Sequence, residues 1–283
     1  MALSKLSGDE QRILFTQLCN VLEPRTAVYL SSASNELRTS TQALLPQLRA
    51  DHEAATALCL KVGLRSCKEL REAKQIDWFG RGLTAADLTL LVTLGSVLPA
   101  LETLILDSTA SPGGVKRLAE GLGAGALPAV TILQLIRMHV GDAGASALAA
   151  ALGQGALPRL KILSLINTAI GDAGLVALAP ALRRLPMLEE FDCQGNLLGD
   201  EGLAALVAPP PPAGAPPTPT EVLTKLKLLD LKNTQVTDAG CAALAAALDG
   251  GALPALKELF LYGIPASAAA KAAVGRAGLK VSV

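Results

Sequence analysis

The sequence is poor in aromatic side chains and has no surplus of charge of either sign. Among 283 residues there are four Phe, two Tyr and one Trp, so a hydrophobic core must be built from Leu, Ala, Val and Ile. Lys plus Arg and Asp plus Glu number 25 each, which gives a formal net charge of zero. Proteins that bind a nucleic acid duplex usually carry a basic surplus to neutralise its phosphates. We therefore expect no nucleic acid partner.

Long hydrophobic runs are also missing. No stretch reaches the ~18 uninterrupted apolar residues that a membrane helix needs, and Asp9, Glu10 and Arg12 stand where a signal peptide would be apolar. Hydrophobic residues make up 51% of the chain, which is too many for a disordered protein. We expect a soluble protein with no membrane partner, in the cytoplasm or, as the alternative, the nucleus.

Few residues could bind a metal or act as a nucleophile. The five cysteines show no C-x-x-C spacing, and the two histidines, His52 and His139, lie far apart in sequence. The cysteines are expected to be reduced and mostly buried. Gly-rich strings at 121–125 and 153–155 end helical patterns, so they indicate turns instead of phosphate loops. We expect no enzymatic activity, no catalytic residue, no cofactor and no metal.

A unit of nearly 29 residues repeats along most of the chain. Residues 160–170, LKILSLINTAI, fit the pattern L-x-x-L-x-L-x-x-N-x-L with Thr168 at the Asn position. The same frame begins at Leu101, Val130, Leu188, Leu226 and Leu256, and a weaker copy spans Ala73–Trp78. After each of four of these strand patterns, a helical pattern begins at an Asp expected to be the N-cap, and several of the helical patterns have Leu at i and i+4. These aspartates are Asp142, Asp172, Asp200 and Asp238.

The repeats resemble the leucine-rich repeat family, in its ribonuclease-inhibitor-like subclass with one strand and one full α-helix per unit. The resemblance covers about residues 73–283 and assigns residues 71–283 to a leucine-rich-repeat domain. It implies an α/β fold, a curved solenoid with a parallel sheet on the concave face and α-helices on the convex face. With a first strand in Ala73–Trp78 and a last one in 279–283, we expect eight parallel strands.

Three features depart from the family pattern. Met138 and Ile264 take the Asn position, where neither can bond the backbone of neighbouring turns, so the spine should be irregular or hydrated there. Residues 208–220 are an insert in which seven of the 11 residues from Pro209 to Pro219 are proline; we interpret it as a loop, with a P-x-x-P ligand as the alternative. Pro180 is expected to kink or break the helix that follows Asp172.

Residues 1–70 do not follow the repeat and show helical patterns. Acidic Asp9-Glu10, Ile13-Leu14 and the segment up to Arg38 look like a degenerate F-box. That resemblance implies docking of residues 1–40 to the adaptor subunit of a cullin-type ubiquitin ligase, with the repeats selecting the substrate. The alternative is a small helical N-terminal cap over the open end of the solenoid.

Strand alternation predicts which side chains lie on the concave surface. Four isoleucines lie side by side on two neighbouring predicted strands and should form one exposed patch. Acidic residues of the next strand border this patch, and two aromatic residues lie further along the same face. The predicted partner-binding residues are Ile132, Ile136, Ile162, Ile166, Glu190, Asp192, Asp230, Phe260 and Tyr262. The expected function is non-enzymatic binding of a protein partner. An enzyme-class alternative, a GTPase-activating protein of the Ran type, is disfavoured because such relatives typically carry a long acidic C-terminal tail, and this chain ends in GLKVSV.

Overall fold

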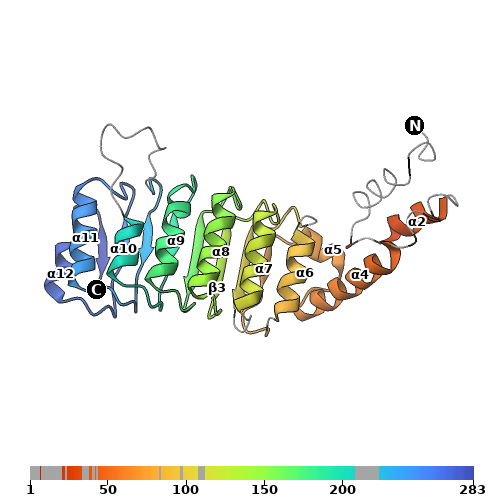
Figure 1. The fold of residues 1–283 in the computed structure, drawn as a ribbon, viewed down its shortest axis with the longest axis horizontal. Coiled ribbons are helices and arrows are strands. Elements are labelled where there is room, and N and C mark those ends of the chain that lie inside the picture. The colour runs from red at the N-terminus through yellow and green to blue at the C-terminus, as the bar shows by residue number, and fades with distance from the viewer. Residues whose placement is uncertain are drawn as a thin grey trace.

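The computed structural model describes residues 7, 21–22, 24–33, 38–39, 42, 44–82, 84–95, 98–107, 112–207 and 223–283. Among these residues, three helices precede the first strand, and strands then alternate with helices (Figure 1). The helices are α2 (Arg25–Ala33), α4 (Leu44–Lys61), α5 (Cys67–Glu72), α6 (Ala85–Leu94), α7 (Pro112–Gly123), α8 (Gly141–Gly153), α9 (Asp172–Arg183), α10 (Asp200–Leu206), α11 (Asp238–Asp249) and α12 (Ala268–Ala273). The strands are β1 (Gln75–Asp77), β2 (Thr103–Asp107), β3 (Ile132–Ile136), β4 (Ile162–Ile166), β5 (Glu190–Asp192), β6 (Leu228–Asp230), β7 (Glu258–Phe260) and β8 (Lys280–Ser282).

The strands form one parallel sheet in the order of the chain, β1 to β8. The register follows the repeat frame, so that Ile132 is paired with Ile162 and Ile136 with Ile166. The expected fold class and the eight parallel strands are both confirmed, including the short strands β1 and β8 in the predicted end segments.

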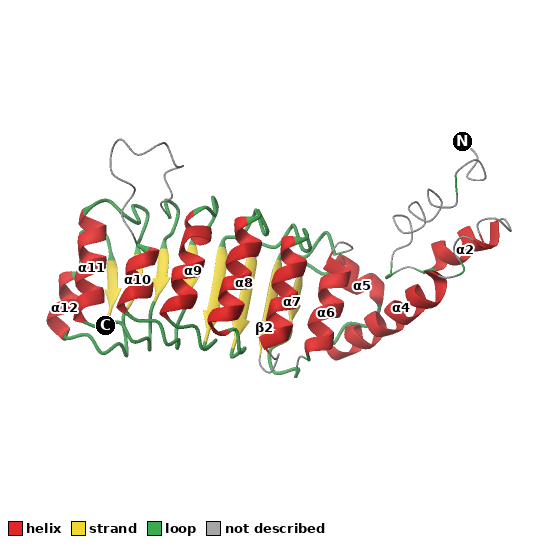
Figure 2. Cartoon of the chain, in the orientation of Figure 1, coloured by secondary structure: helices red, strands yellow, loops and turns green. Residues whose placement is uncertain are grey.

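The two layers of the solenoid have different natural spacings. Parallel strands lie ~4.8 Å apart, whereas α-helices with their side chains are ~10 Å across. A row of helices on one face of the sheet must therefore spread more than the strands do, which leaves the sheet on the concave side. Figure 2 shows this arrangement as one row of helices in front of one layer of strands.

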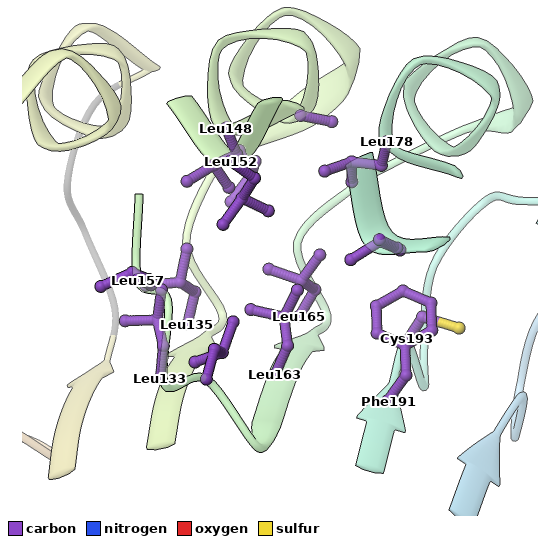
Figure 3. Packing of buried hydrophobic residues seen from close by; sticks show 14 of the residues in the cluster. Leu133, Leu135, Leu148, Leu152, Leu157, Leu163, Leu165, Leu178, Phe191 and Cys193 are labelled. Atoms are coloured by element: carbon purple, nitrogen blue, oxygen red, sulfur yellow. The ribbon is translucent and has the colours of Figure 1, made fainter. Parts of the chain in front are cut away.

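The core lies between the sheet and the helices and is almost entirely aliphatic. In β3 the exposure alternates along the strand, with Leu133 and Leu135 buried and the residues between them half-buried. Their side chains point toward the helical layer, where they meet Leu148 and Leu152 of α8 (Figure 3). Stacking of such units buries surfaces that no single unit could bury alone.

The four aspartates expected as N-caps do not cap their own helices, and that expectation is wrong by one position for Asp172, Asp200 and Asp238 and by two positions for Asp142. Helix α9 begins at Asp172 itself, with Gly171 as its N-cap residue. The carboxylate points away from its own helix and toward the next repeat. Asp172 Oδ1 accepts the N–H groups of Gly199 (2.7 Å) and Gly202 (2.8 Å) at the start of α10. It thus satisfies the N–H of the N-cap residue Gly199 and that of Gly202, the third residue of the helix, which an N-cap side chain would otherwise bond.

The same contact recurs along the solenoid, and we call the four carboxylates the aspartate ladder. Asp142 Oδ1 accepts the N–H groups of Gly171 and Gly174 at 2.7 and 3.0 Å. Asp200 bonds both the N–H and the hydroxyl of Thr237, and Asp238 does the same with Ser267. The bonds from the backbone N–H and the hydroxyl of Ser267 lower the pKa of Asp238.

The ladder explains the glycine two residues after Asp172, Asp200 and Asp238. A Cβ atom at Gly202 would lie 2.7 Å from Asp172 Oδ1, and one at Gly240 would lie 2.2 Å from Asp200 Oδ1. Both distances are too short for a carbon atom to occupy. Glycine is therefore needed so that the preceding carboxylate can approach the third N–H of the helix.

At one repeat, the Asn position is occupied by an asparagine that bonds the backbone through both its oxygen and its amide nitrogen. Asn196 Oδ1 accepts the N–H groups of Thr168 and Ile170 at 3.1 and 3.0 Å, and its amide donates to the carbonyl of Cys193 at 2.8 Å. Thr168 and Thr234 are buried and donate instead to carbonyls three residues earlier in their own repeats. The substitutes without a polar group, Met138 and Ile264, are also buried.

The break expected at Pro180 is wrong, because α9 runs without interruption from Asp172 to Arg183. Pro180 lies near the end of the helix and on its exposed side. The carbonyl deprived of an N–H partner belongs to Val176, whose side chain is 38% exposed. Water can hydrate that face of the helix, which makes proline tolerable there.

Several expectations fall outside the described residues. They concern most of the F-box-like segment, Cys19, Thr109 and the proline-rich insert 208–220. The other four cysteines are free and buried, as expected. In the part of the chain that the structure describes, no helix has both the length and the apolar character needed to cross a bilayer.

Replacing Asp172 by Ala should destabilise the solenoid. The substitution leaves the N–H groups of Gly199 and Gly202 without their acceptor, at a cost of about 1–2 kcal/mol. The melting temperature, measured by circular dichroism, should fall by roughly 2–8 °C. The matched control is Glu201→Ala, an exposed residue in the same helical turn as the bonded groups, which should change the melting temperature little. Equal effects of the two substitutions would contradict the role of the ladder.

Candidate protein-binding surface

The concave face of the sheet presents three columns of side chains, because every second residue of each strand points away from the core. Eight of the nine predicted partner-binding residues occupy these columns, and Tyr262 follows two residues after the end of β7. One column runs through Ile132, Ile162, Glu190, Leu228 and Glu258. The next runs through Gln134, Ser164, Asp192, Asp230 and Phe260.

The four isoleucines form two rows instead of one continuous patch. Ile132 pairs with Ile162, and Ile136 pairs with Ile166 further along the same two strands. Gln134 and Ser164 lie between the two rows. Ser164 is only 3% exposed, since its short side chain lies below its longer neighbours. We call the two pairs the isoleucine rows; all four side chains are half-buried in the free protein.

The acidic residues begin on the next strand. Glu190 pairs in register with Ile162, and Asp192 pairs with Ser164. Burial raises the pKa of Asp192, and the neighbouring Asp230 raises it further, although the N–H of Gln194 donates to its carboxylate at 3.0 Å. The fold thus holds Asp192 in a site where its negative charge is poorly compensated.

The negative charge of Asp230 is compensated by Lys232, two residues later in the chain. It is only 5% exposed and accepts both the N–H of Lys232 (2.9 Å) and the Lys232 ammonium group (2.8 Å). The same ammonium lies 4.9 Å from the ring centre of Phe260. Asp230 and Phe260 are therefore engaged by Lys232, whereas Tyr262 is 64% exposed. Among the predicted residues, Tyr262 offers an aromatic ring that is already accessible.

A second cluster of cation, carboxylate and ring lies toward the N-terminal end of the concave face, and the sequence patterns did not reveal it. The Arg137 guanidinium donates to Asp107 through Nε at 3.0 Å and through Nη2 at 2.5 Å, and it lies 4.9 Å from the ring centre of Phe79. Asp107 is fully buried, while Phe79 is 55% exposed. The bonds to Asp107 raise the pKa of Arg137, so the guanidinium stays charged.

Three of the buried thiols, those of Cys59, Cys193 and Cys241, are poor nucleophiles. Burial raises the pKa of Cys59 to about 12, with a further contribution from Cys67, and it raises the pKa of Cys193 and Cys241 as well. A thiol reacts as its thiolate, which these surroundings disfavour. Within the same part of the chain, no three His, Cys, Asp or Glu residues are grouped as a metal ion would require.

Comparison with solved structures finds many matching chains, among them the following two. A chain from the crystal structure of the Rad7 and Elc1 complex in yeast is 16% identical, with a TM-score of 0.45, over 70% of this chain. This chain spans 44% of the length of that yeast chain. Internalin C2 from Listeria monocytogenes is 20% identical, with a TM-score of 0.43, over 81% of this chain and 91% of its own.

Comparison by sequence identifies the repeats directly. No curated protein matches the chain. The family model described as Leucine Rich repeat matches residues 157–179 and 222–245. Each matched segment includes a strand of the sheet and the beginning of the helix that follows it, and the same strand–helix unit continues on both sides. The two matched segments are thus similar to leucine-rich repeats, and the same strand–helix unit builds the rest of the solenoid.

Proposed function

We propose that the protein is a non-enzymatic scaffold that binds a protein partner on its concave face. The observation that carries the proposal is the arrangement of the isoleucine rows directly beside Glu190 and Asp192 on one continuous sheet. The sheet is held by hydrogen bonds from strand to strand and is packed on a full layer of helices. A partner would therefore meet a preformed surface, which lowers the cost of ordering on association.

The chemistry of this face indicates what the partner must supply. Half-buried isoleucines lose their remaining contact with water when an apolar side chain covers them, which contributes roughly 25 cal/mol for each Å² buried. The poorly compensated carboxylate of Asp192 favours a cation beside that apolar group. The proposed partner therefore presents an apolar anchor next to a Lys or Arg.

We also propose the ribonuclease-inhibitor-like subclass for these repeats. The helices α6, α7, α8, α9 and α11 contain 10 to 13 residues each, so a full α-helix follows five of the eight strands, whereas α10 and α12 contain 7 and 6 residues. Shorter segments in place of helices would narrow the convex layer and flatten the arc.

Replacing Ile132 and Ile162 together by Asp should abolish partner capture. The two new carboxylates would interrupt one isoleucine row and add negative charge beside Glu190. Proteins captured from a lysate by the wild-type chain should fall at least ~10-fold in the double variant, as measured by mass spectrometry. The melting temperature should fall by only a few degrees, because both side chains are half-buried on the outer face of the sheet.

The control adds the same charge to the convex face. Thr93 and Val176 are exposed on α6 and α9, and the double variant Thr93→Asp/Val176→Asp should capture the same proteins as the wild type. The concave face would be excluded as the binding surface by either of two results. The Ile132→Asp/Ile162→Asp variant would still capture the partner, or both double variants would lose it equally.

Replacing Asp192 by Asn should weaken partner binding and, at the same time, raise the stability of the free protein. The raised pKa means that ionised Asp192 costs stability at neutral pH, so the neutral Asn should raise the melting temperature there. The gain should vanish as the pH falls through the pKa of Asp192, where the wild-type residue also becomes neutral. Affinity for the captured partner should fall about 10-fold, since a charge-assisted contact is lost. An Asn variant that is stabilised but binds unchanged would remove Asp192 from the proposed contact.

A second candidate function, docking to a ubiquitin-ligase adaptor, is favoured by the exposure of α2. Within that helix Ala27 and Ser31 are buried, whereas Val28 is 43% exposed and Tyr29 is 71% exposed. Figure 1 shows α2 projecting beyond α4, away from the solenoid. Helix α4 contacts both α5 and α6, so it is α4 that would act as a cap on the solenoid. Exposed apolar side chains on a helix outside the cap suit a partner.

Direct binding tests this second candidate. If residues 1–40 act as an F-box, a purified adaptor subunit should bind the full chain, and Tyr29→Asp should weaken that binding at least ~10-fold. Tyr262→Asp, a change at an equally exposed tyrosine on the concave face, is the control and should leave adaptor binding intact. Absence of adaptor binding by the wild-type chain would leave the concave scaffold as the proposed function.

A further inference from the structure

A cleft of about 810 Å³ lies in the N-terminal helical region, outside the concave face. Its walls come from the start of α2, the middle of α4 and the segment that leads into α5. The lining residues are Leu22, Pro24, Arg25, His52, Thr56, Arg65, Ser66, Cys67, Lys68, Arg71 and Glu72. We call it the basic cleft, because four of its eleven lining residues are Lys or Arg and one is Glu.

The floor and the rim of the basic cleft differ in character. Leu22 and Cys67 are buried at 6% and 7% exposure and form an apolar floor. Arg25, Arg65 and Lys68 are exposed around it. The floor is fixed in place, since the ring of His52 bonds the carbonyl of Val21 at 2.8 Å and thereby ties the preceding segment to α4.

The charge of the cleft stands out in a neutral chain. Residues 24–74 contain eight Lys or Arg against five Asp or Glu, although the whole chain carries 25 of each. The acidic groups near the rim neutralise this positive charge only in part. Glu72 lies 4.0 Å from Lys68 at an exposed pair, and Glu69 accepts the backbone N–H of Arg65, so it does not bond the guanidinium in that contact. Exposed pairs of this kind are weak and easily exchanged for a ligand.

We propose that the basic cleft binds an acidic polypeptide segment of a protein partner. The cations come from three places in the chain, Arg25 on α2, Arg65 before α5 and Lys68 within it, so positive charge is spread along the cleft. Arginine binds carboxylates with two parallel hydrogen bonds, which suits side chains of Asp and Glu.

The size of the cleft favours a segment over a single anion. A volume of about 810 Å³ matches sites for extended ligands and far exceeds the space that one phosphate fills. The apolar floor also has no role for a bare phosphate, whereas it can contact the stems of Glu side chains or an apolar residue among them. A duplex would be met by a protruding element, not by the walls of a cleft.

Fluorescence anisotropy with the full chain tests this site. The probe is a labelled peptide of alternating Glu and Ala, compared with the same peptide containing Gln in place of Glu. The Glu peptide should bind more tightly, with an affinity that falls as salt is added. Arg25→Glu/Arg65→Glu should weaken binding at least ~10-fold, because it reverses two exposed charges at the rim without touching the buried floor.

Two controls make the outcome decisive. Arg49→Glu/Arg159→Glu changes the net charge equally at exposed residues outside the cleft and should alter the affinity less than ~2-fold. Ile132→Asp/Ile162→Asp should leave peptide binding intact, so failure of this site and failure of the concave scaffold can be told apart. Equal loss in both arginine variants, equal binding of the Gln peptide, no binding, or tighter binding of a single-stranded oligonucleotide than of the Glu peptide would each overturn the proposal.

Discussion

A carboxylate that reaches from one repeat to the start of the next helix sets the geometry of the central and C-terminal repeats. Each ladder aspartate accepts the N–H of the residue just before a helix, 27 to 37 residues later in the chain. Because the bond fixes where each helix starts relative to its neighbour, the strands preceding those helices keep one register. Loop lengths between units can then vary without shifting the sheet. The frames that begin at Leu188 and Leu226, for example, are 38 residues apart, whereas the usual spacing is nearly 29.

The regular register separates the residues that hold the fold from those available for binding. Leucines facing the helices and the ladder at the helix starts account for the stacking, and neither reaches the concave surface. The isoleucine rows, Glu190 and Asp192 are therefore held in fixed positions by a framework to which they contribute little. The raised pKa of Asp192 is the cost of placing a carboxylate there, and a cation from a partner would relieve it.

The sequence predicted the solenoid, its eight strands and its pairing correctly, because Leu spacing repeats with one period and alternation assigns each side chain to a face. It failed where a contact depends on neighbours in space. The N-cap rule is local, so it assigned Asp172 to its own helix although the bonded groups lie in the next one. Arg137 and Phe79 belong to different repeats at positions without a common pattern. The basic cleft arises between helices outside the repeat, where no period was available to align them.

The aspartate ladder also means that each central repeat carries both of the groups that a junction between two repeats needs. A unit with the Asp-x-Gly start carries a carboxylate for the helix after it and a glycine that leaves room for the carboxylate before it. Duplication of such a unit by unequal recombination would therefore supply both halves of a new junction at once. Growth of the arc by whole units needs no compensating substitution, whereas a foreign unit with alanine at the glycine position would clash at its first helical turn.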